Sequence, residues 1–466
     1  MKASRHVRIL PEEHSGVDSP EALPSGPPVQ RLAAPLRRAI LRTRQWLLSS
    51  QQLDGCWVGE LEGDTILESE YVLLQAFLGR QQSEPAMSAA RYLLDQQLPD
   101  GGWSLYPGGQ VDISASVKAY FALKLTGHDP SAESMQRARA AILAHGGADA
   151  VNSFTRFYLA LLGQISYDHC PAVPPEVLLL PRWSPVNIAR VSAWSRTILV
   201  PLSIMSAYQP VTQIDSRLGI SELFLQRPES WPPLRCPGKK GGSGPLSWDC
   251  FFRTADRMFK FLQRRNWLPL RRRAIRAAER WMVERFAGSE GLGAIFPPII
   301  WSIVALRCLG YSDDSPEVQY CHEHLDGLTI RERDTVRLQP CKSPVWDTAI
   351  TLRALHASGI DAGDSAVVDA LEWLLANEVG RAGDWQQTVR AEPGGWCFEY
   401  ANEFYPDVDD TIMVMMAFHG HGTSATEEAT LPPPLKLHAT HEADPSDTES
   451  GSLAARPTKL RERMTA

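Results

Sequence analysis

One phrase recurs along this chain and limits what it can fold into: an apolar helical stretch, a glutamine-rich turn, an Asp-Gly step and a tryptophan. The first copy is "QWLLSSQQLDGCW", which closes on Trp57, and the second is "YLLDQQLPDGGW", which closes on Trp103. A third copy, "AERWMVERFAGSEGLGAIFP", carries Leu292 in the tryptophan's place, and a fourth ends at Trp396. Recurrence of this kind indicates repeated supersecondary units that bury their apolar faces against one another. We therefore assign these tryptophans to stability.

The stretches between the copies also carry helical periodicity. "DTILESEYVLLQAFLG", "SASVKAYFALKLTG" and "VWDTAITLRALHASG" each close on a glycine, where a helix commonly ends. Alternation of apolar and polar residues with period 2, which is typical of β-strands, is scarce. The prediction is an all-α fold of paired helices arranged in rings or barrels. Residues 1–34 and 419–466 instead have compositions typical of disordered segments.

Charge and cysteine usage exclude several classes of function. The net charge of -7 over 466 residues leaves no basic face of the kind that binds nucleic acid. The eight cysteines are scattered without Cys/His spacing for a metal, which predicts reduced thiols in a cytosolic chain. No apolar run is long enough for a signal peptide or a membrane span, so we expect the chain to be neither exported nor membrane-spanning.

The segment "FYPDVDDT" places three carboxylates, Asp407, Asp409 and Asp410, within four residues. Like charges and burial both raise the pKa of a carboxyl group, so such a cluster can keep a proton at neutral pH. The simpler interpretation is that these aspartates, which follow Pro406, cap the N-terminus of a helix. Both interpretations can hold together, because an acid at a helix start is also held rigidly.

The repeats resemble the QW motifs of triterpene cyclases, and "DVDDT" resembles their Asp-x-Asp-Asp acid motif. The similarity is greatest to squalene-hopene cyclases, and it extends over roughly residues 40–418 through "DGCWVGELEGDTILESEYVLL", "FYLALLGQISYDHCPAVPPEVLLLP", "NIARVSAWSRTILVPLSIM", "SPVWDTAI" and "PGGWCFEYANEFYPDVDDT". This resemblance implies a monotopic enzyme on the cytoplasmic face of the cell membrane. In such an enzyme, two α-α barrels enclose a cavity in which squalene or a similar polyprene closes into hopene-type products.

The resemblance also implies a domain plan. Residues 35–329 would form a first α-α barrel, whose first helix packs on the second barrel. Residues 330–418 would form part of a second barrel. Family members carry a further C-terminal portion, with more repeats and a histidine that supports the acid, which this sequence lacks, so the second barrel is expected to be incomplete. No cofactor and no metal are expected, and a homodimer is a possibility.

By resemblance, Asp409 is the proton donor, and Asp407 and Asp410 share its hydrogen-bond network. Aromatic faces stabilise a migrating carbocation without supplying a nucleophile. The residues implied to line the substrate cavity are Trp194, Ile295, Trp346 and Phe398. An aromatic residue on a buried helix is usually only core, so these four rest on the matching local phrases. Phe296 is a departure, since some relatives have a polar residue there.

Residues 248–276, "WDCFFRTADRMFKFLQRRNWLPLRRRAIR", interleave aromatic and basic side chains, among them Phe251, Phe252, Phe259, Phe261 and Trp267. This mixture suits a helix that lies in a membrane interface. An amphipathic helix packed on its own core, with a solvated charged face, explains the same pattern. Because the resemblance implies a monotopic enzyme, it favours membrane contact.

Two other functions stay open from the sequence. One is a non-catalytic remnant of a cyclase that still binds lipid, because the acid would face solvent if the second barrel is incomplete. The other is a class II diterpene cyclase, which uses the same acid motif on a prenyl diphosphate. The QW repeats, together with the lack of an obvious diphosphate-binding cluster, argue against the diterpene cyclase.

Overall fold

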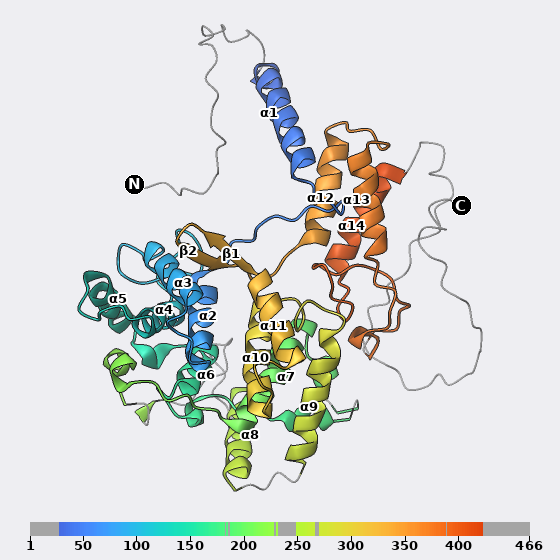
Figure 1. The fold of residues 1–466 in the computed structure, drawn as a ribbon. Coiled ribbons are helices and arrows are strands. Elements are labelled where there is room, and N and C mark those ends of the chain that lie inside the picture. The colour runs from blue at the N-terminus through green and yellow to red at the C-terminus, as the bar shows by residue number, and fades with distance from the viewer. Residues whose placement is uncertain are drawn as a thin grey trace, which may run out of the picture.

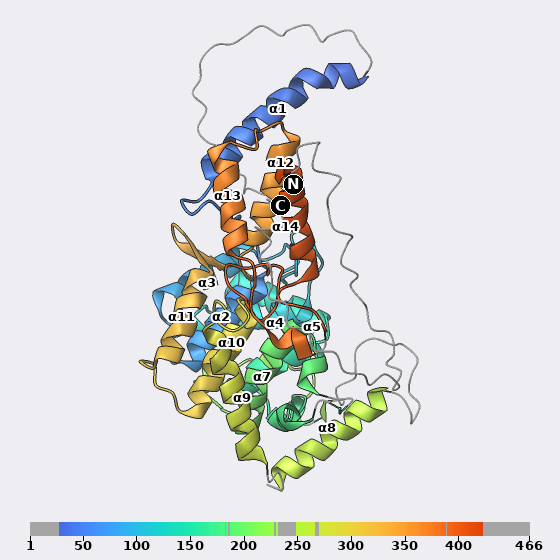
Figure 2. The same ribbon diagram turned by 90° about the vertical axis from the view of Figure 1, so that its right-hand side faces the viewer.

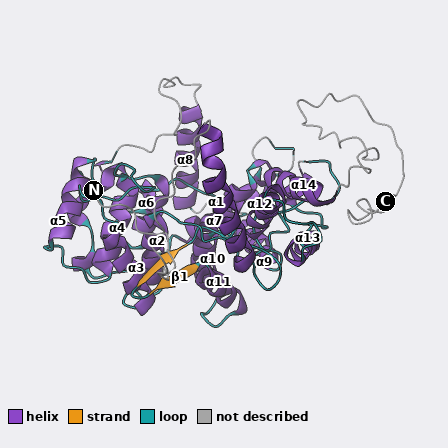
Figure 3. Ribbon diagram, turned by 90° about the horizontal axis from the view of Figure 1, so that it is seen from above, coloured by secondary structure: helices purple, strands orange, loops and turns teal. Residues whose placement is uncertain are grey.

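The computed structural model (Figure 1) describes residues 28–422, apart from residues 182, 185–186, 228–229, 232–247, 266–269 and 388. Helices and turns build almost all of it, which confirms the predicted all-α class (Figure 3). The larger group of helices comprises α2 (Thr65–Phe77), α3 (Glu84–Asp95), α4 (Ile113–Leu125), α5 (Glu133–Ala144), α6 (Ser153–Leu161), α7 (Ala193–Tyr208), α8 (Trp248–Arg264), α9 (Arg271–Phe286), α10 (Phe296–Leu309) and α11 (Pro316–Gly327). The smaller group comprises α1 (Pro28–Ser50), α12 (Pro344–Ala357), α13 (Ser365–Ala376) and α14 (Val408–Gly422).

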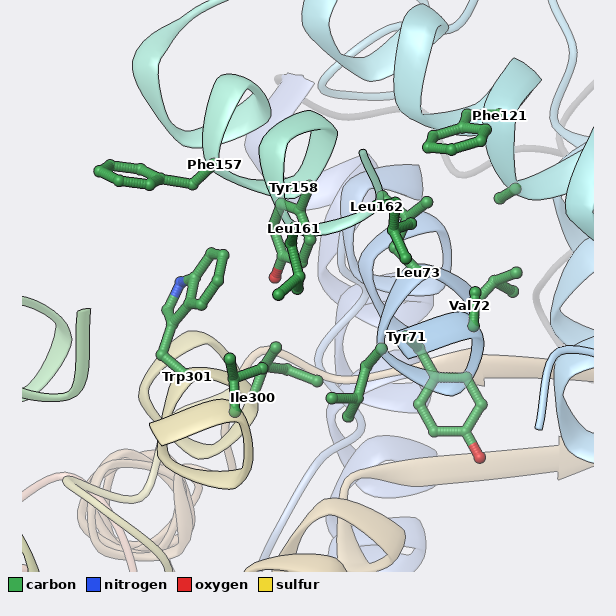
Figure 4. Close-up of a cluster of buried hydrophobic side chains, with 14 of the residues drawn as sticks. Tyr71, Val72, Leu73, Phe121, Phe157, Tyr158, Leu161, Leu162, Ile300 and Trp301 are labelled. Carbon is green, nitrogen blue, oxygen red and sulfur yellow. The ribbon is translucent and has the colours of Figure 1, made fainter. Parts of the chain in front are cut away.

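The larger group surrounds the first hydrophobic core. Figure 4 shows its centre, where Tyr158 of α6 stacks on Trp301 of α10 with ring centroids 4.5 Å apart. A buried ion pair crosses this core, since Lys118 Nζ lies 2.5 Å from Glu70 Oε1. The Tyr158 hydroxyl donates to the other oxygen of Glu70 at 3.0 Å. The charge of each partner is therefore compensated inside the apolar interior.

The second core lies between α12, α13 and α14, beyond the larger group (Figure 2). Trp57 and Trp396 are buried in it, and Leu47 and Leu48 at the end of α1 pack against it. The remainder of α1 extends past α12 and α13 and leaves most of its apolar side chains exposed. The N-terminal repeat is thus part of the core that the last described helices build.

The repeated phrase forms the same turn in each copy that ends in tryptophan. The indole Nε1 atoms of Trp57, Trp103 and Trp396 donate to the carbonyls of Leu47, Leu93 and Leu374, at 2.7, 2.8 and 2.7 Å. Each indole therefore donates to a carbonyl near the C-terminal end of its helix, where the intrahelical donors run out. These contacts confirm the predicted structural role of the tryptophans.

The glutamine of the turn joins its unit to a helix that is not the next one in the sequence. Gln51 Nε2 donates to Gly55 O at 2.7 Å and to Ala366 O in α13 at 2.8 Å. Gln97 Nε2 repeats this with Gly101 O and with Ser134 O in α5, both at 2.8 Å. One side-chain amide therefore both closes its own turn and binds the first turn of another helix.

A two-stranded hairpin, β1 (Thr329–Glu332) and β2 (Thr335–Leu338), was not predicted from the sequence. Val336 and Leu338 of β2 are buried in the first core. The Leu338 N–H also donates to Glu68 Oε1 of α2 at 2.7 Å. The boundary expected after residue 329 consequently falls inside this hairpin, and residues 335–338 pack with the first core.

The ends of the described region also differ from the sequence prediction. α1 begins at Pro28, within the segment 1–34 expected to be disordered, because its apolar spacing already starts at Leu32. α14 continues to Gly422, into the segment 419–466, because His421 Nε2 hydrogen-bonds Leu352 O at 3.0 Å. Residues 1–27 and 423–466 lie outside the described residues. Within the described part, no helix is both long and apolar enough to cross a membrane.

Candidate active site

Asp407 caps the helix that carries the acid motif. Its Oδ1 accepts the Asp410 N–H at 3.0 Å, as in an N-terminal cap. Its own N–H donates to Trp396 O at 2.9 Å, and its carbonyl accepts the Thr411 hydroxyl at 2.6 Å. That hydroxyl in turn accepts the Trp396 N–H at 3.1 Å. The helix cap predicted for these aspartates is therefore present, and the tryptophan of the fourth repeat holds it in place.

The two aspartates inside α14 lie in different surroundings. Asp409 is exposed, whereas Asp410 is only 1% exposed. Burial is the main cause that raises the pKa of Asp410 to about 8, and the carboxylates of Asp407 and Asp409 raise it further. Among the described residues, Asp410 Oδ1 has no hydrogen-bond partner. The proton that the sequence assigns to the cluster is thus best held at Asp410.

The exposed face of α14 around Asp409 is apolar. Val408, Ile412, Met415 and Met416 all expose large side chains. Residues three and four apart share one face of a helix, so Asp409 lies on the same face as Ile412 and Met416. The described residues therefore leave the residue expected to be the proton donor on an uncovered apolar face.

The four predicted cavity residues fall into two pairs. Trp346, at the start of α12, and Phe398 lie together with ring centroids 6.4 Å apart, and both are half-buried. Trp194, in the first turn of α7, is 39% exposed, and Ile295 directly precedes α10. The turn before Ile295 packs on α7, because a Cβ atom at Gly293 would lie 2.8 Å from the Thr197 side chain.

Two cavities formed by the described residues are small. The larger, about 260 Å³, is lined by Phe77, Leu78, Pro210, Arg307, Cys308 and Asp313. The smaller, about 30 Å³, is lined by Glu290, Ala294, Ile299, His324, Gly327, Leu328 and Lys342. Pockets for drug-sized ligands have roughly 300–1,000 Å³. Neither cavity is lined by the aspartates of the motif or by the four predicted cavity residues.

A buried charge cluster that the sequence did not reveal joins the two groups of helices. Arg285 of α9 binds Asp384 through two nitrogens, with Nε 3.1 Å from Oδ2, and Arg196 Nη1 lies 3.7 Å from the same oxygen. The Tyr405 ring covers the Arg196 guanidinium at 5.5 Å. Because Tyr405 lies two residues before Asp407, the cluster anchors the segment that leads into the acid helix.

Glu399 is a second acidic residue that sequence reasoning missed. It follows Phe398, is 1% exposed, and accepts Asn402 Nδ2 at 3.2 Å. Burial raises its pKa to about 8. The signal available in the sequence was the glutamate in "WCFEY". It lies directly between two aromatic residues, and side chains in such an apolar stretch cannot all face the solvent. In the part of the chain that the structure describes, no group of three or more His, Cys, Asp or Glu residues is placed to hold a metal ion.

Comparison with known families agrees with this arrangement. The family model described as "Squalene-hopene cyclase N-terminal domain" matches residues 40–334, and the one described as "Squalene-hopene cyclase C-terminal domain" matches residues 342–431. This chain belongs to the squalene-hopene cyclase family. The C-terminal domain match ends just after α14, so the acid helix is the last described element that it includes.

Curated members of the squalene-hopene cyclase family are similar over most of this chain. A squalene-hopene cyclase of Zymomonas mobilis is 40% identical over 81% of this chain and 58% of its own length. One of Bradyrhizobium diazoefficiens is 39% identical over 84% of this chain and 60% of its own length. The chain thus spans about 60% of the length of these relatives.

Among solved structures, the apo form of the type II terpene cyclase MstE from Scytonema matches 74% of this chain and 80% of its own. The sequence identity is 16% and the TM-score is 0.18, which is too low to support an inference about the site or the reaction of this chain.

Proposed function

We propose that this chain is a triterpene cyclase that protonates squalene, or a similar polyprene, and closes it into hopene-type pentacyclic products. The observation that carries the proposal is the Asp-x-Asp-Asp motif at the start of α14 in a member of the squalene-hopene cyclase family, in which burial raises the pKa of Asp410, beside the donor, to about 8. An ordinary aspartate, with a pKa of about 3.9, is ionised at pH 7 and cannot donate a proton to an alkene.

The proposed reaction is redox-neutral. An O–H bond of the acid breaks and a C–H bond forms at the terminal double bond, which leaves a carbocation that successive double bonds attack. Loss of a proton from the last cation closes the cycle. In this proposal Asp409 delivers the proton, while Asp407 and Asp410 hold the network behind it. Trp194, Trp346 and Phe398 would face the cations, and Ile295 would shape the wall.

A second candidate function is a lipid-binding unit without catalysis. Asp409 and the large apolar side chains of Val408, Ile412, Met415 and Met416 are exposed on α14. An apolar face of this kind can bind an apolar chain without enclosing it for protonation.

One experiment separates the two candidates. The purified chain is incubated with squalene in detergent, in parallel with geranylgeranyl diphosphate, and the products are extracted and analysed by mass spectrometry. Cyclised squalene that disappears in Asp409→Asn supports the triterpene cyclase. Folded protein that binds squalene without product supports the lipid-binding unit. Product from the diphosphate alone would favour a diterpene cyclase.

We also propose peripheral contact with the cytoplasmic face of the membrane through α8. Phe251, Phe252, Met258 and Phe261 expose large apolar surface on this helix, whereas Phe259 is half-buried. Trp267 lies outside the described residues. Interfacial helices combine such a face with basic residues at anionic headgroups. Co-sedimentation with anionic vesicles tests the contact, and Phe251→Ser combined with Phe261→Ser should abolish it.

The homodimer is tested separately by light scattering.

A further inference from the structure

The third repeat closes its helix differently from the other three. Leu292 stands in the place of the tryptophan, and a leucine side chain has no N–H with which to bind a carbonyl. Arg285, in the last turn of α9, carries donors instead, and its Nη1 donates to Trp281 O at 2.8 Å. Its guanidinium also lies over the Trp281 ring at 3.9 Å. This repeat therefore places a charged side chain at the end of its helix, where the others have an indole.

The remaining nitrogens of Arg285 bind the second group of helices. Nε lies 3.1 Å from Asp384 Oδ2, Nη2 binds Oδ1 of the same carboxylate, and both side chains are buried. Asp384 lies in the segment between α13 and α14. Pairing of a guanidinium with a carboxylate through two hydrogen bonds fixes orientation as well as distance. Arg285 thus ties the end of α9 to the connection that leads towards the acid helix.

The turn that follows α9 binds a second part of that connection through its backbone. The Glu290 N–H donates to Ala401 O at 3.1 Å, and the Glu403 N–H donates to Gly288 O at 2.9 Å. An isolated antiparallel bridge forms between these two hydrogen bonds. The turn of the third repeat consequently holds residues 401–403, a few residues before the acid motif begins.

Phe404 closes the contact between the turn and the guanidinium. Its ring lies 5.1 Å from the Arg285 guanidinium. A Cβ atom at Gly288 would lie 2.7 Å from the same ring, so the turn and the ring are in close contact. We call Arg285, Asp384, the turn 288–290 and the segment 401–404 the joint. Only two residues separate the joint from Asp407, which caps α14.

The joint is adjacent to two of the residues proposed to line the substrate cavity. Ile295 follows the turn 288–290 along the chain. Trp194 precedes Arg196 by two residues in α7, and Arg196 Nη1 lies 3.7 Å from Asp384 Oδ2. The same carboxylate therefore receives one arginine from the helix of Trp194 and another from the repeat that leads to Ile295.

We propose that the joint positions the acid motif of α14 relative to Trp194 and Ile295, and that Arg285 is its central positioning residue. The importance of this position for catalysis rests on the proposed function, whereas the restraint of residues 401–411 by the joint does not. In enzymes, a displacement of a reacting group by about 1 Å costs about a hundredfold in rate. The divergence of the third repeat then serves the acid site of the fourth.

Hydrogen–deuterium exchange of the full chain, read by mass spectrometry of peptides, tests the restraint without any turnover. The variant is Arg285→Gln, which leaves Asp384 with Arg196 as its charge partner. Peptides within 401–411 should exchange about tenfold faster, because hydrogen bonds to charged groups that restrain this segment are lost. Peptides of the second repeat, within 93–103, should exchange as in the wild type.

Arg271→Gln is the matched control, since Arg271 also lies in α9 and its Nε is 2.7 Å from Glu176 Oε1, outside the joint. It should leave exchange within 401–411 unchanged. Phe404→Leu removes the ring from the guanidinium without removing a charge, and it should speed up exchange within 401–411 by about threefold. Unchanged exchange of this segment in folded Arg285→Gln and Phe404→Leu would overturn the proposal. Equal acceleration in both repeats would overturn it too, because the effect would then be general destabilisation.

Steady-state kinetics separates the positioning role from a merely structural one. If the wild type cyclises squalene, Arg285→Gln should lower kcat about tenfold or more and change KM by less than about twofold, since the acid is displaced while the substrate still binds. Arg271→Gln should leave both constants unchanged. An unchanged kcat, or a change in KM alone, would overturn the positioning of the acid. Lack of turnover by the wild type would refute the proposed function and leave the exchange result valid.

Discussion

The second and fourth repeats build the same turn from the same hydrogen bonds, yet only the fourth adds carboxyl groups after the capping aspartate. In the second repeat the Asp112 N–H donates to Trp103 O at 2.8 Å, and Ser116 Oγ accepts the Trp103 N–H at 2.9 Å while donating to Asp112 O at 2.7 Å. Asp407, Trp396 and Thr411 repeat this arrangement.

Two of the three residues between the capping aspartate and the hydroxyl residue make the difference. Ser114 and Ala115 occupy, in the second repeat, the places of Asp409 and Asp410 in the fourth. Ala115 is fully buried, as Asp410 nearly is. The comparison teaches that the candidate acid site is an ordinary structural turn in which one buried small residue has been replaced by a carboxyl group.

Glu68 of α2 in the first core shows that burial alone does not identify the acid. It is as buried as Asp410, and burial raises its pKa to about 8 as well. At Asp410 the neighbouring carboxylates of Asp407 and Asp409 both add to the burial, whereas at Glu68 the effect of Asp64 is opposed by Arg337. An elevated pKa is therefore informative only together with the motif around it.

The largest expected effect comes from placing a carboxyl group in the second repeat. Ala115→Asp should lower the free energy of unfolding at pH 7 by about 3–5 kcal/mol, because an uncompensated buried charge costs that much. The loss should shrink at pH 5, where the new carboxyl keeps its proton. Urea denaturation at both pH values measures it.

Ala132→Asp is the control for that substitution, since Ala132 is exposed and directly precedes α5. Aspartate is favoured at such a position, so stability should stay constant or rise slightly. Equal losses in the two variants would show that the second repeat does not discriminate against a buried acid, and the parallel between the repeats would fail.

An intermediate effect is expected from the hydroxyl that both turns share. Ser116→Ala and Thr411→Val should each lower the free energy of unfolding by about 1–2 kcal/mol, because each leaves a tryptophan N–H without its acceptor. Hydrogen exchange should speed up in the first turn of the adjoining helix. Thr254→Val, at an exposed position in α8, is the neutral comparison. A loss in only one of the two repeats would break their equivalence.

The last test concerns the pH dependence of stability. The folded-state pKa of Asp410 lies near 8, above its value of 3.8 in a model peptide, so the folded state binds more protons between those pH values. Its stabilising contribution is complete below about pH 4 and is lost as the pH rises towards 8. Asp410→Asn should flatten this decline by up to about 1.4 kcal/mol per pH unit. An unchanged slope would contradict an un-ionised Asp410.

Much of the architecture could be predicted from local sequence. The turns that close on Trp57, Trp103 and Trp396 follow from composition, since glycine, glutamine and tryptophan each satisfy a local backbone requirement. The helix cap at Asp407 could be predicted for the same reason. The hairpin was not, because its side chains find their places only against α2 and α3, which lie far away in the sequence.

The sequence could not show which aspartate of the acid motif is buried and which is exposed. Adjacent helical residues point in directions about 100° apart, so one of Asp409 and Asp410 is buried only if a partner covers its side. The loop that contains Trp396 binds Asp407 and Thr411 on either side of these residues, and a single sequence cannot orient that loop. The cluster of Arg196, Arg285 and Asp384 could not be predicted from the sequence either, because its members come from three separate segments.

The hydrogen bond from the Trp57 N–H to the Thr348 hydroxyl, at 2.9 Å, spans 291 residues of sequence. Ribosomes add about 5–20 residues per second, so the emerging N-terminal turn waits roughly 15–60 s before its acceptor has been synthesised. During translation the apolar side chains of this turn lack the native residues against which they pack. The start of this protein should consequently depend on chaperones more than its end does.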